Sequence, residues 1–401
     1  MARQLLSDIP DFLHTSPFLP VGTQDDSHNP IKKVQAKPSL GQIIRSKHFR
    51  TVVVFIVIAL ALLTLPANIR NYHPFTRLGI SGPRCYFTDP VTMPSIPEGE
   101  VDWSQFAYSL YATTPDALCS SLMLFSALHQ QSSRADRILL YTPDLLSSPS
   151  ATHLLSVAQN IYEVKPVLVE KQHKNNVHYI WADSYTKLLA FNQTQYKRLI
   201  HLDSDSTLRG DIDALFFLPS AEVILPRAYW LEKPKLSSHI MVLQSSTMAF
   251  EKVQKAIGEA TRGTYDMEII NSLFGNECAI LPHREYALLT GEFRSPDPKH
   301  MAFVDGKGEW DPATVMQEAK FVHFSDYPFS KPWEETSAEE QENAVPACVV
   351  GEEGKVDCRA RDIWIELYKD FKARRKVGLD SLLGYLCKMT DSWALERMWF
   401  G

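Results

Sequence analysis

The stretch HLDSDSTL, from His201 to Leu208, directly follows the residues RLI and decides how the rest of the chain is interpreted. Two aspartates, Asp203 and Asp205, come at the end of a run that reads as a buried strand. Aspartate and serine are also common turn residues, so the pattern alone fits an ordinary strand-to-loop turn as well. A chemical role for the two aspartates therefore depends on the sequence around them.

Strand-like and helix-like segments alternate on both sides of this stretch. We predict strands at residues 106–112, 136–142, 164–170 and 198–205, and helices between them at residues 119–131, 151–160 and 184–195. Alternating strands and helices imply right-handed crossovers and a largely parallel sheet. The expected fold class is therefore α/β, with a mixed, mostly parallel sheet.

The position of the two aspartates in this fold favours a ligand site. Ligands of such sheets gather at the carboxyl ends of the strands, which is where Asp203 and Asp205 lie. The two residues are two apart, so in an extended chain their carboxylates point the same way. Convergent carboxylates suit a hard divalent ion such as Mg²⁺ or Mn²⁺, and such an ion can hold a diphosphate.

The bulk composition narrows the class of protein. The chain has 401 residues, of which 45% are hydrophobic, and this allows one large domain or two ordinary ones with a sizeable core. Its formal net charge is −6, which gives no reason to expect nucleic-acid binding.

One segment differs from a globular domain. Residues 51–67, TVVVFIVIALALLTLPA, carry no charge and are near the short limit for a membrane-spanning helix. Arg45, Lys47 and Arg50 precede the segment, whereas only Arg70 follows closely, so the N-terminus is expected in the cytosol and the remainder in a lumen. A span this short suits the thin membranes of the early secretory pathway.

The expected organisation has four parts: a disordered cytosolic tail (1–50), a transmembrane signal anchor (51–69), a proline-containing stem (70–100) and one luminal domain (101–401). All six cysteines follow the anchor, and an oxidising lumen would permit disulfides. Cys348 and Cys358, which bracket a short polar loop, are the first expected pair.

Ordered motifs from Phe106 to Trp333 carry a family resemblance. They are YATTPDALCSSLMLF (111–125), SYTKLLAFNQTQYKRLIHLDSDSTLRGDIDALF (184–216), PRAYW (226–230), SSHIMVLQSS (237–246), YDMEIIN (265–271) and FVHFSDYPFSKPW (321–333). In these motifs the chain resembles the family 8 glycosyltransferases, the glycogenin-like group. It is most similar there to the fungal Golgi N-acetylglucosaminyltransferases, often named glucose N-acetyltransferases.

The resemblance implies a nucleotide-diphospho-sugar transferase fold of the GT-A type and a set of site residues. Mn²⁺ (or Mg²⁺) would be bound by Asp203, Asp205 and His323. Lys331 would pair with the diphosphate of a UDP-sugar, and Asp266 would lie near the transferred sugar; these two are the catalytic candidates. The remaining donor-binding candidates are Tyr111, Thr113, Lys187, Ser204 and Asn271.

Each role has a plain structural alternative. His323 could be a buried structural histidine between Phe321 and Phe324. Lys187 and Lys331 could be exposed, solvated lysines, as most lysines are. Asp266 could be the N-cap of the helix that follows it.

Two sites depart from the family pattern. Thr113-Thr114 stands where the family usually has Thr-Asn, and Ala117 stands where a tyrosine is expected. Both departures weaken the assignment of a uracil-binding pocket. Ser237-Ser238-His239 replaces the Asn-Ser-Gly of the glycogenin branch, which argues against glycogenin itself, as the membrane anchor also does.

The sequence thus predicts a single-pass type II Golgi membrane enzyme with a luminal catalytic domain. It would be a metal-dependent, retaining glycosyltransferase that moves a sugar, N-acetylglucosamine in the first instance, from a UDP-sugar to a glycan or glycoprotein acceptor. The alternatives are a transferase of the same fold that uses UDP-glucose or UDP-galactose, a catalytically silent membrane-anchored glycan-binding scaffold, and a metal-dependent phosphatase or nuclease. The last would need more clustered acidic or histidine ligands than the sequence offers.

Overall fold

The computed structural model describes residues 89–174, 181–276, 278–306, 308–350, 354–377 and 387. The expected cytosolic tail, signal anchor and most of the stem lie outside these residues. Within the described residues, no helix combines the length and apolar character needed to cross a membrane.

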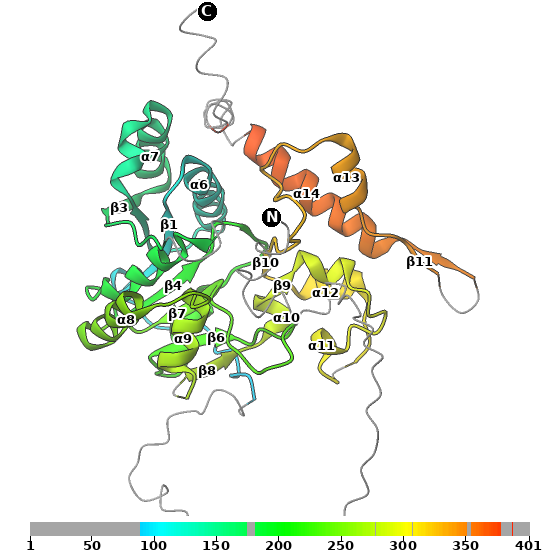
Figure 1. Cartoon of the computed structure of the whole chain (residues 1–401). Helices are drawn as coiled ribbons and strands as arrows, with labels where there is room; N and C mark the ends of the chain where they lie inside the picture. Colours follow the sequence, from blue (N-terminus) through cyan, green and yellow to red (C-terminus); the bar gives the residue numbers. More distant parts are fainter. Residues whose placement is uncertain are drawn as a thin grey trace, which may run out of the picture. The chain divides into compact units, whose positions relative to one another are not determined.

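A seven-stranded sheet forms the centre of the domain (Figure 1). Its strands are β1 (Phe106–Ala112), β2 (Asp136–Tyr141), β3 (Val164–Leu168), β4 (Arg198–Leu202), β6 (Val223–Pro226), β7 (Ile240–Leu243) and β8 (Cys278–Leu281). They are ordered β3-β2-β1-β4-β7-β6-β8. Neighbours pair in parallel except at β7, which runs antiparallel to both β4 and β6. The predicted mixed, mostly parallel α/β sheet is confirmed.

Helical segments cover both faces of this sheet, as Figure 1 shows. One face carries α6 (Pro115–Gln130), α7 (Pro149–Tyr162) and the short helices η3 (Trp103–Gln105), η4 (Pro143–Ser147) and η7 (Asp213–Phe217). The other face carries η6 (Ser184–Asn192), α8 (Thr247–Glu259) and α9 (Asp266–Phe274).

The strand and helix boundaries follow from local sequence. In β1, Phe106, Tyr108 and Leu110 pack towards α6 and α7, while Ala107 packs towards η6 and α8, as the two-residue period of a strand requires. The helix α6 begins where Thr114 caps the amide of Ala117 and a proline occupies the first turn.

A smaller second part packs beside the central sheet. It contains a three-stranded sheet, ordered β5-β10-β9, made of β5 (Ser206–Leu208), β9 (Leu288–Leu289) and β10 (Phe321–His323). Its helices are α10 (His283–Tyr286), η8 (Thr290–Arg294), α11 (Met301–Val304), α12 (Pro312–Glu318), α13 (Ala338–Ala344) and α14 (Arg359–Val377). Buried residues of β9, β10, α12 and α14 form its own apolar core.

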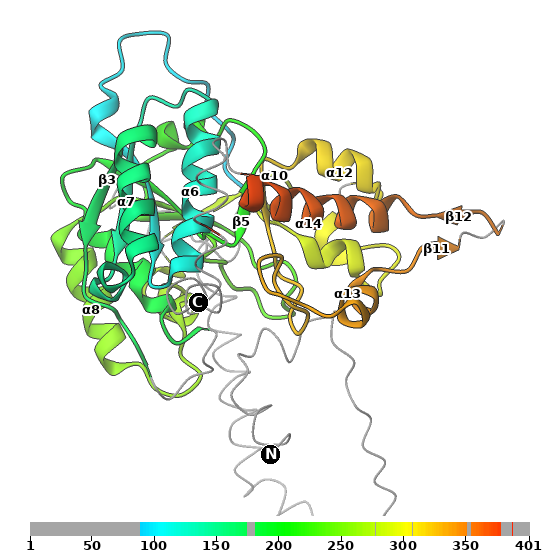
Figure 2. The ribbon, with the colours of Figure 1, turned by 90° about the horizontal axis from the view of Figure 1, so that it is seen from above.

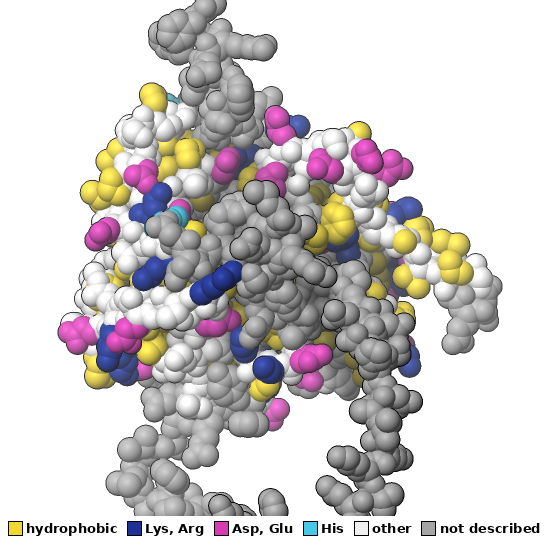
Figure 3. All heavy atoms as spheres, viewed as in Figure 1, with side chains coloured by type: hydrophobic (Ala, Val, Ile, Leu, Met, Phe, Trp, Pro, Cys, Tyr) yellow, Lys and Arg dark blue, Asp and Glu magenta, His cyan; other side chains and the backbone are white. Residues whose placement is uncertain are grey.

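The long helix α14 runs from the neighbourhood of α6 to a two-stranded hairpin (Figure 2). The hairpin consists of β11 (Val349–Val350) and β12 (Val356–Asp357), and the Cys348–Cys358 disulfide closes its base, as predicted. Its three valines are exposed and contribute to the hydrophobic patch seen there in Figure 3. A second disulfide joins Cys119 of α6 to Cys387.

The structure refines two expectations. The helix predicted at residues 184–195 is a 3₁₀ helix over Ser184–Asn192, and each residue from Ser184 to Phe191 is buried. Its packing on all sides overrides the α-helical propensity of the segment. Residues 91 and 93, which we assigned to the stem, pack against the core, and the amide of Val91 donates to the carbonyl of Ile280 at 2.8 Å.

Candidate active site

The two aspartates lie where the central sheet passes into the small sheet. β4 ends at Leu202 and β5 begins at Ser206, so the DSD turn spans the junction. The amide of Asp203 donates to the carbonyl of His239 at 2.9 Å, next to β7. The carbonyl of Asp205 accepts from the amide of Phe324 at 2.9 Å, next to β10. The backbone of the turn is therefore held from both sheets.

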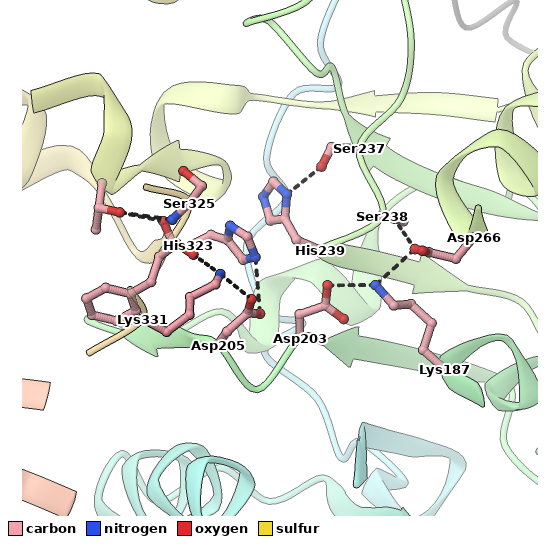
Figure 4. A network of polar contacts seen from close by, with 12 residues as sticks. Lys187, Asp203, Asp205, Ser237, Ser238, His239, Asp266, His323, Ser325 and Lys331 are labelled. Carbon is pink, nitrogen blue, oxygen red and sulfur yellow. Dashed lines mark hydrogen bonds and ion pairs between the residues drawn. The ribbon is translucent and has the colours of Figure 1, made fainter. Parts of the chain in front are cut away.

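Strand pairing brings His323 to this turn from more than a hundred residues away. β10 pairs antiparallel with β5, and the register places His323 opposite Ser206. As a result, His323 Nε2 lies 3.1 Å from Asp205 Oδ1 (Figure 4). Asp203, Asp205 and His323 each offer a ligand atom, and these three atoms lie within 4.8 Å of one another. The predicted metal-ligating residues are thus together in the fold.

Lys331 reaches the same turn from the loop that follows β10. Its Nζ lies 2.8 Å from Asp205 Oδ2 and also donates to the carbonyl of Phe324. Burial acts to raise the pKa of Asp205, but the electrostatic effect of His323 and Lys331, together with their hydrogen bonds, outweighs burial and holds this pKa well below its ordinary value. Asp205 is accordingly an ionised acceptor at neutral pH.

Lys187 forms the opposite side of the cluster (Figure 4). Its side chain is only 5% exposed, and its Nζ lies 2.7 Å from Asp203 Oδ2 and 3.0 Å from Asp266 Oδ2. Asp266 also accepts a hydrogen bond from Ser238 Oγ at 2.7 Å. Burial acts to lower the pKa of Lys187, but the carboxylates of Asp203 and Asp266 raise it well above its ordinary value. Lys187 is therefore a buried cation and not the exposed, solvated lysine that the sequence also allowed.

Asp266 is the first residue of α9, and the structure places the N-cap at Tyr265. Burial raises the pKa of Asp266, and the larger combined effect of Lys187 and the hydrogen bonds of Ser184 and Ser238 lowers it. Ser238 lies in one of the family-like motifs but was not among the predicted site residues. Its contact with Asp266 gives that residue a place in the site.

Two buried histidines line the cluster and were not assigned a role from the sequence. His201 Nδ1 lies 3.3 Å from Ser109 Oγ, and His201 Nε2 lies 3.8 Å from Asp203 Oδ1. The ring of His239 stacks on that of His323, with centroids 5.1 Å apart. Burial lowers the pKa of both histidines, that of His239 to about 3, so both are neutral at neutral pH. The alternation of β4 could have indicated His201, because it lies two residues before Asp203.

The donor atoms of the cluster suit a divalent cation. Asp203 Oδ1 is buried and lacks a hydrogen-bond partner within the described residues, although an unpaired buried polar atom is costly. Two carboxylates and one imidazole are an acceptable set for Mn²⁺, and carboxylates alone also suit Mg²⁺. The residues present therefore fit the predicted metal.

The remaining residues predicted to bind the donor make different contacts around the cluster. The ring of Tyr111, at the carboxyl end of β1, stacks on that of His201 with centroids 6.0 Å apart. Thr113 is buried and precedes the cap of α6, and Ser204 is half-buried in the DSD turn. Asn271 bonds both backbone groups of Leu236, accepting from the amide at 2.8 Å and donating to the carbonyl at 2.9 Å. Asn271 thus fixes the chain that leads to Ser238.

Comparisons with known proteins place the chain in a family. It is 44% identical over 294 residues to glucose N-acetyltransferase 1 of Gibberella zeae, a match that covers 70% of this chain and 64% of that protein. The chain is 39% identical over 311 residues to glucose N-acetyltransferase 1 of Aspergillus fumigatus, covering 72% and 80%. The protein of the same name from Saccharomyces cerevisiae is 26% identical, covering 70% and 83%.

No family model matches the chain. Among solved structures, the glycosyltransferase GlyE of Streptococcus pneumoniae is similar with a TM-score of 0.42 and 12% sequence identity, covering 68% of this chain and 64% of that one. The two sequence relatives above 30% identity agree with the resemblance noted in the motifs. The chain therefore belongs to the fungal glucose N-acetyltransferase family, a family of transferases.

Proposed function

We propose that the protein is a metal-dependent, retaining glycosyltransferase of the GT-A type that moves N-acetylglucosamine from a UDP-sugar to a glycan acceptor. The observation that carries this proposal is the meeting of Asp203, Asp205 and His323 within 4.8 Å, beside two lysines. A glycan-binding scaffold has no need of such a set. A phosphatase or nuclease usually has more acidic or histidine ligands, and the described residues contain no second group of this kind.

The residues of the cluster divide into two roles. Asp203, Asp205 and His323 would hold the ion, which when bound supplies a Lewis acid and a template for the leaving diphosphate. Lys331 lies 2.8 Å from Asp205, so its charge would stabilise the charge that grows on the departing nucleoside diphosphate. Lys187 holds Asp203 and Asp266 together, which keeps Asp266 at a constant position for the transferred sugar.

The compartment is proposed to be the Golgi lumen, with a single-pass type II anchor. Two disulfides and the disulfide-bonded Cys278 fit an oxidising secretory compartment. The apolar residues 51–67 with their basic flank supply the anchor in this proposal.

The test is a donor screen with the purified full-length chain and Mn²⁺. Release of UDP is measured from UDP-N-acetylglucosamine, UDP-glucose and UDP-galactose, with and without EDTA. We expect EDTA-sensitive release that is fastest with UDP-N-acetylglucosamine. Faster release from UDP-glucose or UDP-galactose would keep the transferase and overturn the sugar, whereas no release from any of these donors would overturn the function.

A further inference from the structure

A buried carboxylate outside the metal cluster holds the loop that carries Lys331. This closing loop comprises residues 324–333, between β10 and the turn at Trp333. The side chain of Asp326, three residues after His323, has no exposed surface. A buried carboxylate is costly unless hydrogen bonds satisfy its oxygens, so its partners indicate what it does.

The first partners of Asp326 belong to η8. Thr290 Oγ1 donates to Asp326 Oδ2 and accepts from the amide of Ser325 at 3.0 Å. Arg294 Nη1 lies 3.7 Å from Asp326 Oδ1, and the guanidinium of Arg294 stacks on the ring of Phe329 at 3.8 Å. One segment, Thr290 to Arg294, thus holds the closing loop at three of its residues.

The other partners of Asp326 belong to α14. Trp364 Nε1 donates to Asp326 Oδ1 at 3.1 Å, and the hydroxyl of Tyr368 donates to Asp326 Oδ2 at 2.8 Å. The two aromatic rings stack on each other with centroids 4.1 Å apart, so they present both donors from one face of the helix.

The helix also packs against both ends of the closing loop. The ring of Phe371 lies 4.9 Å from that of Phe324 and 5.7 Å from that of Trp333, measured between centroids. Arg374 Nη2 donates to Thr207 Oγ1 of β5 at 2.8 Å, two residues after Asp205. Thus α14 contacts the closing loop and the strand that follows the metal-ligating turn.

We propose that Asp326, Trp364 and Tyr368 are positioning residues, which hold the closing loop so that the ammonium group of Lys331 meets the leaving diphosphate. This inference rests on the proposed function of the site. It assigns to α14, which lies beyond the last family motif, an effect on the rate of transfer that acts through Lys331. Displacing a catalytic group by about 1 Å can lower a rate by about 100-fold, so the loss of one anchor is expected to be measurable.

The experiment compares two tyrosine variants of the full-length chain. Tyr368→Phe removes the hydroxyl that donates to Asp326, and Tyr196→Phe removes a hydroxyl that donates to Asp136 at the same distance, 2.8 Å, outside the site. Each variant loses one hydrogen bond to a carboxylate. Because Asp326 is fully buried whereas Asp136 is partly exposed, we expect Tm to fall by about 2 °C in Tyr196→Phe and by at least that in Tyr368→Phe. Only Tyr368→Phe should lower kcat, by about tenfold, while the KM for the donor changes less than twofold.

Two further measurements separate positioning from general stability. In a Lys331→Ala background, Tyr368→Phe should lower kcat by less than twofold, because positioning acts through Lys331. Amide hydrogen exchange at Ser325 and Phe329 should be faster in Tyr368→Phe than in wild type and unchanged in Tyr196→Phe. Equal kcat in the two tyrosine variants, or unchanged exchange in the closing loop, would overturn the inference. The exchange measurement tests how the closing loop is held even if no UDP-sugar is turned over. A lack of turnover would refute the proposed function instead.

Discussion

At the scale of single residues, the site alternates negative and positive side chains. Lys187 lies between Asp266 and Asp203, at 3.0 and 2.7 Å, and Lys331 lies 2.8 Å from Asp205. Each lysine therefore places a positive charge beside carboxylates that are buried or half-buried.

Removal of either metal-ligating carboxylate should abolish transfer. We expect Asp203→Asn and Asp205→Asn to lower the rate by about 1000-fold or more, because metal stabilisation of the leaving group contributes several kcal/mol and each 1.4 kcal/mol is about tenfold. The rate and Mn²⁺-dependent UDP binding should be measured together, with the exposed Asp144→Asn as a control. Near-normal activity in either variant would refute the metal role.

Lys187 should matter for stability as well as for activity. Lys187→Met leaves the carboxylates of Asp203 and Asp266 buried without their cation, which costs about 3–5 kcal/mol in the free energy of unfolding. The more exposed pair of Lys235 with Glu268 supplies the control Lys235→Met, which should cost about 1 kcal/mol or less.

The cost of Lys187→Met should depend on pH. In the native protein the pKa of Asp266 is below its ordinary value of 3.8, so its contribution is present at neutral pH and is lost only as pH falls through the lowered pKa. In the variant, Lys187 no longer lowers this pKa, burial still raises it against the hydrogen bonds of Ser184 and Ser238, and protonation relieves the buried charge. The difference in denaturant midpoint between wild type and variant should therefore be larger at pH 8 than at pH 5; an equal difference at both pH values would contradict this assignment.

At the scale of elements, the pairing of β5 with β10 assembles the site. The strand β5 follows Asp205 directly, and β10 ends in His323, so one antiparallel register brings both candidate ligands together. The loop after β10 then returns Lys331 to the same turn. A loop of this kind can exclude water from an activated sugar when it closes.

Substitutions of His323 and Lys331 should therefore affect different quantities, the first Mn²⁺ binding and the second the rate of transfer. His323→Ala should weaken Mn²⁺ binding by at least about tenfold, because it removes a ligand. Lys331→Ala should leave Mn²⁺ affinity nearly unchanged and lower the transfer rate by about 100-fold, because its charge acts on the departing diphosphate. Titration of Mn²⁺ and initial rates measure the two effects, with Lys320→Ala, at the start of β10, as the control. Equal loss of metal affinity in both site variants would contradict the division of roles.

At the scale of the whole molecule, the proposed membrane anchor and oxidising compartment would determine where the site works. All six cysteines follow the apolar residues 51–67, and the Cys119–Cys387 disulfide closes a separation of 268 residues. Such bonds persist in oxidising compartments.

The orientation of the chain can be tested on sealed microsomes. Because the basic residues Arg45, Lys47 and Arg50 precede the apolar segment, protease added outside should trim only the N-terminal tail. The fragment that follows Arg70 should become sensitive only after detergent is added. Its digestion without detergent would reverse the proposed topology.

The sequence by itself determined those features that have a local signal. The short, mostly apolar run Phe106–Ala112, the apolar run before Asp203 and the alternation of strand-like and helix-like segments predicted the sheet. The motifs indicated the family that the comparisons confirm, and the short spacing of Cys348 and Cys358 indicated their pairing.

Only the tertiary structure decided which distant side chains meet. The contact of Ser238 with Asp266, the attachment of Asn271 to Leu236 and the burial of Asp326 against α14 have no local period in the sequence. They depend on strand register and on packing between elements that are far apart in the chain. The sequence motif named His323 and Lys331, but the register of β10 against β5 sets their distances to Asp205, because a shift by one residue would turn His323 to the other face of the sheet.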